Sequence, residues 1–157
     1  MSEREQFELF LRLLLAAGLG AAIGLERDYR GHDAGLRTSA LVAMGAALFG
    51  EVSRQIGDDR VAAGVVQGVG FLCAGLVFQT GAQVRGITTA ATVWVLAGVG
   101  LLVAFELRLT AILVTAMIVV VLELAPISDK INGRGRWTGH RGFPEDTPPT
   151  DHHTDTR

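Results

Sequence analysis

The sequence predicts an all-α membrane protein that crosses the bilayer five times and ends in a disordered tail. Hydrophobic residues make up 49% of the 157 residues and charged residues only 19%, below the usual quarter for soluble domains. The charges are clustered, so that between Val61 and Phe105 only Arg85 is charged. A soluble helical domain could not solvate its surface with so few charges. From Asp129 onward the apolar runs give way to glycine, proline and charged residues.

The apolar runs predict a transmembrane domain over residues 1–128 and a disordered cytoplasmic tail over residues 129–157. The tail holds few large apolar side chains, so it cannot bury enough surface to order itself. The N-terminus is acidic and lacks the basic segment of a signal peptide, so we expect the first run to stay in the mature protein. The expected spans are residues 7–25, 36–52, 61–78, 88–105 and 107–124.

The first span forms a helix of about 28 Å at about 1.5 Å per residue, which is close to the hydrocarbon thickness. We expect Arg12, near its start, to extend its side chain toward the headgroups. The second span is the weakest, because it opens with Arg37-Thr38-Ser39 and ends at Glu51. This composition favours a helix in the bundle interior over one that faces lipid.

The third span is rich in glycine, which indicates tight packing, a local unwinding of the helix, or both. A polar loop follows from Gln79 to Ile87, and Thr88 or Thr89 can cap the fourth span. Trp94 lies near the middle of that span, so we expect its indole N–H to find a partner inside the bundle. The fifth span holds no glycine, so we expect it to face lipid more than the third does; Pro126 ends it.

Small residues mark the helix faces on which backbones can approach closely in lipid. The first span carries a Gly-x-x-x-Gly pair, and the third span carries another pair with further glycines beside it. We therefore expect close helix packing at Gly20, Gly24, Gly64, Gly68, Gly70 and Gly75.

The distribution of Lys and Arg predicts the orientation, because cytoplasmic loops are enriched in both. Nine of the 14 lie in the loops after spans one and three and in the tail, and five lie on the other side. This distribution predicts that the N-terminus lies outside the cell and the C-terminus in the cytoplasm. On this topology the loop after span one and the polar loop from Gln79 to Ile87 both face the cytoplasm.

Glu26 and Arg27 end the first span, where the helix dipole opposes a carboxylate. A structural ion pair with Arg37 across the helical hairpin is the favoured interpretation. Glu26 could equally be a solvated acid at headgroup level or part of a binding site. The sequence shows no arrangement of nucleophile and base, so we expect no enzyme, no cofactor and no metal site. The net charge of -2 gives no sign of nucleic-acid binding.

Four motifs occur in order, and together they resemble the N-terminal membrane domain of the MgtC/SapB family over about residues 9–124. These motifs are Gly20-Ala-Ala-Ile-Gly-Leu-Glu-Arg27, Ala34-Gly-Leu-Arg-Thr38, Gly68-Val-Gly-Phe-Leu-Cys-Ala-Gly75 and Gly86-Ile-Thr-Thr-Ala-Ala91 followed by Trp94. The sequence departs from the family at Cys73, where glycine is usual. Many members also continue into a folded cytosolic domain, and here the expected tail follows instead.

The resemblance implies a bacterial inner-membrane protein linked to magnesium-limited growth. One view of the family implies a non-enzymatic regulator or adaptor that binds other membrane proteins, or itself, within the lipid bilayer. The alternative is a permease for Mg²⁺ or another small solute. The absence of acids deep in the spans favours the regulator. The motifs gather the expected functional residues into one cytoplasmic cluster: Glu26, Arg27, Arg37, Thr38, Arg85, Thr88 and Thr89.

Overall fold

A computed structural model describes residues 2–80 and 83–124. The expected tail, residues 129–157, lies outside the described residues. Five helices follow one another through the described part, as predicted, and an antiparallel β-hairpin separates the third from the fourth. The elements are α1 (Glu3–Tyr29), α2 (Leu36–Ile56), α3 (Asp59–Ala74), β1 (Phe78–Thr80), β2 (Gln83–Arg85), α4 (Ile87–Ala104) and α5 (Arg108–Glu123).

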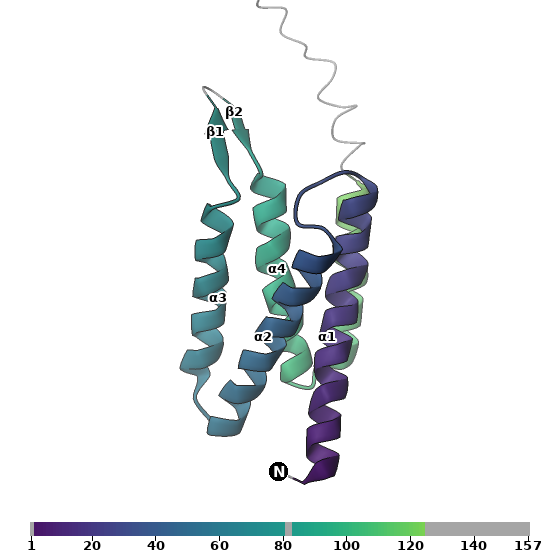
Figure 1. Ribbon diagram of the computed structural model, residues 1–157, viewed down its shortest axis with the longest axis vertical. Coiled ribbons are helices and arrows are strands. Elements are labelled where there is room, and N and C mark those ends of the chain that lie inside the picture. Colours follow the sequence, from purple (N-terminus) through teal and green to yellow (C-terminus); the bar gives the residue numbers. More distant parts are fainter. Residues whose placement is uncertain (1, 81–82, 125–157) are drawn as a thin grey trace, which may run out of the picture. The chain divides into compact units, whose positions relative to one another are not determined.

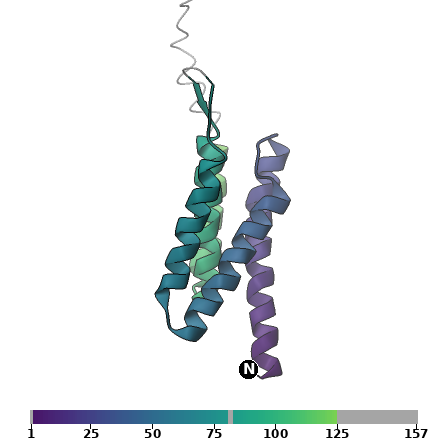
Figure 2. The ribbon, with the colours of Figure 1, turned by 60° about the vertical axis from the view of Figure 1, so that its left-hand side comes forward.

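Successive helices run in opposite directions, so their connections alternate between two ends of the bundle (Figures 1 and 2). The hairpin end carries the loop of residues 30–35, the β-hairpin and the start of α4. The turn end carries the start of α1 and the short turns at residues 57–58 and 105–107. These two ends bring together residues that are far apart in the sequence.

Four of the expected helix boundaries differ from the structure by four residues: both ends of α1, the end of α2 and the end of α3. The helix α1 has 27 residues and starts with a capping box, in which Ser2 and Glu5 exchange hydrogen bonds of 2.7 and 3.3 Å. The helix α3 ends at Ala74, four residues before the expected end, and Phe78 pairs with Arg85 in the hairpin. The helix is regular up to Ala74, so no unwinding interrupts its glycine-rich part.

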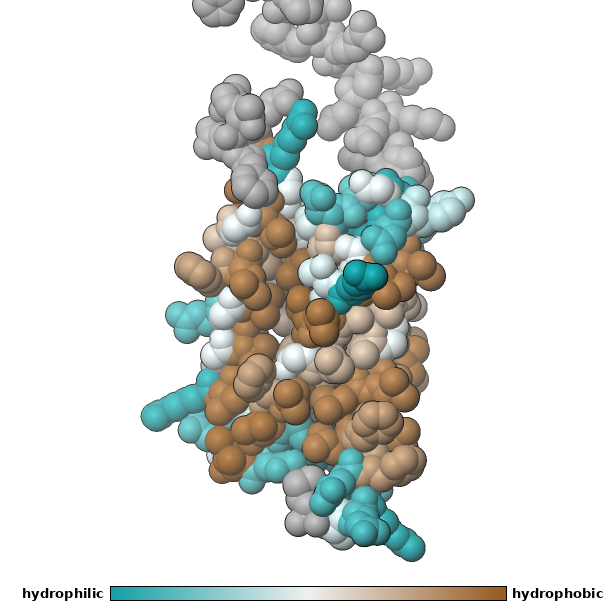
Figure 3. Space-filling view, in the orientation of Figure 1, coloured by the Kyte–Doolittle hydropathy of each residue, from teal (hydrophilic) through white to brown (hydrophobic). Residues whose placement is uncertain are grey.

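Two helices in the described part, α1 and α4, are both long and apolar enough to cross a membrane. The helices α3 and α5 have 16 residues each, about 24 Å at about 1.5 Å per residue, which is shorter than a typical hydrocarbon core. In the space-filling view, hydrophobic residues cover the middle of the bundle and hydrophilic residues gather toward its two ends (Figure 3). This pattern is typical of a protein whose sides face lipid.

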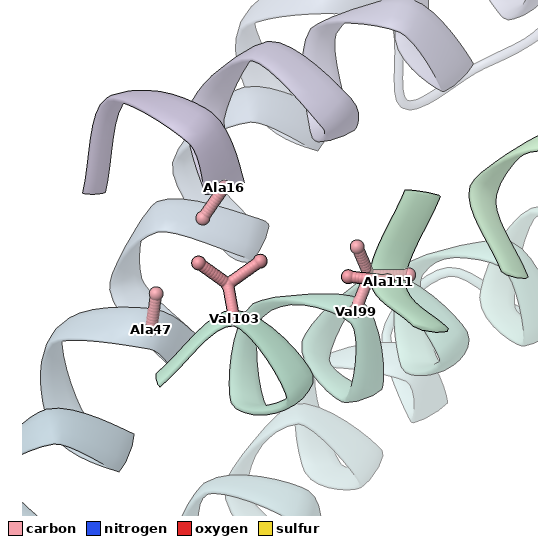
Figure 4. Packing of buried hydrophobic residues seen from close by; sticks show 5 residues of the cluster. All are labelled: Ala16, Ala47, Val99, Val103 and Ala111. Atoms are coloured by element: carbon pink, nitrogen blue, oxygen red, sulfur yellow. The ribbon is translucent and has the colours of Figure 1, made fainter. Parts of the chain in front are cut away.

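The core consists mostly of small and β-branched side chains from α1, α2, α4 and α5, with Leu96, Leu122 and Cys73 of α3 among them. One cluster packs Ala16 and Ala47 against Val99 and Val103, with Ala111 beside them (Figure 4). The helix α2 contacts α1, α3 and α4, which is the interior position that its polar start predicts. Small side chains at these contacts allow the helix backbones to approach closely.

The glycines fall into two groups by their surroundings. A Cβ on Gly20 would lie 2.5 Å from the carbonyl oxygen of Ser39, and one on Gly24 would lie 2.6 Å from Cα of Leu36. Both glycines therefore sit where α1 and α2 touch. On α3, a Cβ would meet nothing within 4 Å at Gly64, Gly68 or Gly70, and Gly75 has only a contact at 3.4 Å. The expectation of tight packing around the α3 glycines is wrong for the single chain.

Candidate functional site

The loop of residues 30–35 places the motif residues at the hairpin end. A carboxylate oxygen of Asp28, near the end of α1, accepts a hydrogen bond of 2.9 Å from the backbone N–H of Leu36, the first residue of α2. The Ser39 hydroxyl donates to the backbone oxygen of Ala34 at 2.9 Å, which ties the loop to the first turn of α2. Gly31 and Ala34 adopt positive φ angles of 69° and 59°. The loop is thus anchored on both sides.

Arg27 joins three segments at this end. Its side chain is almost fully buried, with a relative exposure of 2%. The guanidinium donates to the backbone oxygen of Asp33 from Nε at 3.3 Å and from Nη2 at 3.0 Å. Nη2 also donates to the Thr89 hydroxyl in the first turn of α4. Arg27 therefore connects α1, the loop and α4, and the structure brings together two residues that the sequence predicted in one cluster.

Glu26 pairs with a different arginine from the one expected. Its carboxylate lies 2.8 Å from Nε of Arg30, four residues later in the chain. Arg30 also pairs with Glu123 at the end of α5. The predicted pair with Arg37 is wrong, because Arg37 is exposed on the first turn of α2 while Arg30 sits at the C-cap of α1, beside Glu26. A cation at this position also offsets the unfavourable dipole that Glu26 meets.

The remaining motif residues are exposed at the hairpin end. Their side chains make no hydrogen bond or ion pair with any residue that the structure describes. They come from the first turn of α2, the end of β2 and the start of α4: Arg37, Thr38, Arg85 and Thr88. The seven predicted cluster residues thus divide into a buried clamp, formed by Arg27 and Thr89, the ion-paired Glu26, and an exposed set. We call the four exposed residues the hairpin-end surface.

Gly86 sets the entry into α4. Its φ angle is +86°, in the left-handed region that favours glycine, and a Cβ here would collide with the backbone oxygen of Leu76. The helix begins directly afterwards, at Ile87, so the conformation of Gly86 sets the positions of Thr88 and Thr89 in the first turn of α4. Thr88 then faces outward and Thr89 faces Arg27.

Trp94 does not occupy the place expected for it. Half of its surface is exposed, and it lines a shallow groove on the outside of α4 with Val66, Gly98 and Phe105. The central position in the span suggested an indole inside the bundle. The inward face of α4 is instead taken by smaller side chains, such as Val93 and Ala97, that fit the close contact with α2.

A second charged cluster, which the sequence motifs did not predict, lies at the turn end. Arg12 is buried, and its Nη1 lies 3.2 Å from the Glu51 carboxylate while its Nη2 lies 2.8 Å from Glu106. Arg54 pairs with Glu51 and lies 3.2 Å from Glu106. Arg12 therefore points toward the acids of the turn end, and its guanidinium is buried among them. We call these four residues the turn-end network.

The signal for this network was present in the predicted topology. Arg12 starts the first span, Glu51 ends the second, and Glu106 lies in the turn after the fourth, which puts all three at one end. Arg12 and Glu106 are 94 positions apart, so spacing alone could not pair them. In the described part of the chain, no three His, Cys, Asp or Glu side chains gather as a metal site would require.

Comparison with known proteins identifies what the chain resembles. The model of the MgtC family matches residues 13–130. Protein MgtC of Salmonella typhimurium is 51% identical over 106 residues, which cover 65% of this chain and 46% of that protein. Protein MgtC of Brucella abortus is 48% identical over 110 residues, 68% of this chain and 46% of that protein.

An uncharacterized protein of Synechocystis sp. is 44% identical over 130 residues, which cover 80% of this chain and 56% of the relative. The chain therefore spans about half the length of the curated relatives it matches. No solved structure matches the chain.

Proposed function

The chain belongs to the MgtC family of membrane proteins, and we propose that it acts as a non-enzymatic regulator or adaptor linked to magnesium-limited growth. In this proposal it lies in the bacterial inner membrane with the hairpin end toward the cytoplasm. The hairpin-end surface then binds another membrane protein. The alternative role, a permease for Mg²⁺ or another small solute, makes a different experimental prediction.

The observation that carries this proposal is the division of the motif residues between buried and exposed positions. The buried guanidinium of Arg27 holds the loop and the start of α4 against α1. Arg37 follows the held loop, on the first turn of α2, and Arg85 precedes α4, at the end of β2; both side chains are exposed. Exposed cations on fixed elements support recognition of an acidic partner surface, because little conformational freedom is lost on binding.

Affinity purification from native membranes tests the proposal. Cells grown with low and with ample magnesium would be extracted in mild detergent, using the wild type and the double variant Arg37→Ala/Arg85→Ala. A matched control is Arg60→Ala/Arg108→Ala, which removes two exposed arginines near the turn end. We expect the wild type and the control to recover the same membrane protein and the hairpin-end variant to lose it. Growth in low magnesium should follow the same order.

The permease alternative is separated by a transport assay. We expect proteoliposomes that contain only this chain to show no Mg²⁺ flux above empty vesicles. Flux that Glu26→Gln abolishes would support the permease and contradict the adaptor. Equal recovery of the partner by both double variants would also contradict it, since the hairpin-end surface would then not be the binding surface.

A further inference from the structure

The helix α3 is the least covered of the five helices. Cys73 is its one buried residue, and the main helix contacts of α3 are with α2 and α4 (Figure 2). One side of α3 borders an apolar groove against α2, lined among others by Phe49, Gly64 and Gly68. The side that faces away from the bundle is open. This outward face is separate from the hairpin-end surface.

Gln67 is the polar side chain on that outward face. It lies at the middle of α3, is exposed, and makes no hydrogen bond with any described residue. Across residues 2–80 and 83–124, no other exposed amide, hydroxyl or charged side chain falls in the middle third of a helix. Lipid tails offer an amide no hydrogen-bond partner, so an uncovered Gln67 is costly at membrane depth.

The residues around Gln67 permit another helix to approach closely. Ala63 and Phe71, four residues away on either side, share this face, and Gly64, which also borders the groove, and Gly70 lie at its two edges. A Cβ would meet nothing within 4 Å at either glycine, so that space is free for a neighbour. Phe71 is 82% exposed and adds apolar area beside the small residues. An amide set among small residues is a typical contact between transmembrane helices.

We propose that the outward face of α3 binds the same face of a second copy of this chain. Two copies inserted in the same direction, related by a two-fold axis along the membrane normal, place their Gln67 side chains at the same depth. The amide carries both a donor and an acceptor, so each Gln67 satisfies the other. A different protein would need a matching polar group at that depth. The inference does not depend on the proposed adaptor role.

Cysteine cross-linking in native membranes tests the contact. In a Cys73→Ala background, Ala63→Cys places a thiol one turn from Gln67 and leaves the amide in place. The matched control is Ala116→Cys, an equally small exposed residue on α5. We expect mild oxidation to yield a disulfide-linked dimer of the Ala63→Cys chain and little from the control. Equal cross-linking of the two variants, or a link from position 63 to a different protein, would overturn the proposal.

Energy transfer between labelled copies in diluted vesicles tests the role of the amide. We expect Gln67→Leu to raise the apparent dissociation constant about threefold to tenfold, which matches the usual strength of a hydrogen bond between membrane helices. Gln67→Asn should keep most of the association, because it retains the amide. Unchanged helix content by circular dichroism would show that both variants fold. Association of Gln67→Leu equal to that of the wild type would contradict a contact through this amide.

Discussion

Arg27 shows how one buried charge can organise the hairpin end. Its hydrogen bonds reach a backbone oxygen in the loop and a hydroxyl on α4, so three segments depend on one side chain. The sequence predicted that Arg27 and Thr89 belong to one cluster, because the expected topology places the motifs around both on the same side of the membrane. The sequence could not show that these arginines differ in burial. In the structure Arg27 is buried and Arg37 is exposed.

The contact between Arg27 and Thr89 predicts a difference between two adjacent threonines. Thr89→Val keeps the shape of the side chain but removes the acceptor of a buried guanidinium N–H. We expect a loss of about 1–3 kcal/mol in the free energy of unfolding. Thr88→Val, on the exposed side of the same turn, should change it by about 0.5 kcal/mol or less. Unfolding in mixed micelles, followed by circular dichroism, measures both; equal losses would contradict the clamp.

The turn-end network predicts a second contrast between two acids that both lie near Arg12. The side chain of Glu51 is 5% exposed and that of Glu8 is 63% exposed. Glu51→Gln leaves the charges of Arg12 and Arg54 without their buried counter-ion, so we expect a loss of about 3 kcal/mol or more. Glu8→Gln should cost at most about 1 kcal/mol, because solvent screens that pair. The same unfolding assay measures both variants. Similar losses of stability would show that the burial of Glu51 does not strengthen its pairing with the arginines.

At the scale of whole elements, apolar runs predicted the number and order of the helices. A run of the right length and composition has few other stable structures in a bilayer, which explains this success. The β-hairpin was missed because strands of three residues, Phe78–Thr80 and Gln83–Arg85, are too short to show an alternating pattern. Glycine motifs also could not distinguish the closely packed pair of α1 from the pair of α3, where an added Cβ would meet nothing within 4 Å, because both read Gly-x-x-x-Gly.

The contact between α1 and α2 predicts that two glycines of one helix respond differently to alanine. A Cβ on Gly20 would crowd the backbone of α2, whereas nothing lies within 4 Å of one on Gly18. We expect Gly20→Ala to lower the free energy of unfolding by about 1–3 kcal/mol. Gly18→Ala should leave it unchanged or raise it by up to about 1 kcal/mol, since alanine favours the helix. Equal effects on thermal unfolding in detergent would mean that the helices do not touch at Gly20.

At the scale of the whole molecule, the two polar ends define what the bundle can present on each side of a membrane. The hairpin end combines a buried clamp with exposed arginines, and the turn end holds an ion-paired network. The sequence predicted the first grouping from the order of its motifs. It missed the second, because an ion pair between distant helices requires their depth and rotation to be known. The orientation of the two ends rests on the counts of Lys and Arg.

Thiol labelling tests that orientation together with the number of spans. In a Cys73→Ala background, single cysteines would replace Arg60 or Arg108 near the turn end and Arg37 or Arg85 at the hairpin end. All four positions are exposed, so access to the reagent depends only on the side of the membrane. If all five helices cross with the N-terminus outside, an impermeant maleimide should label positions 60 and 108 in intact spheroplasts.

Positions 37 and 85 should react only after the membrane is permeabilised. The reverse pattern would invert the topology and place the hairpin-end surface outside the cell. Labelling of positions from both ends in intact spheroplasts would mean that some of the five helices do not cross. Because α3 and α5 are short for a full hydrocarbon core, positions 60 and 108 at their starts provide the most sensitive test of the five-span arrangement.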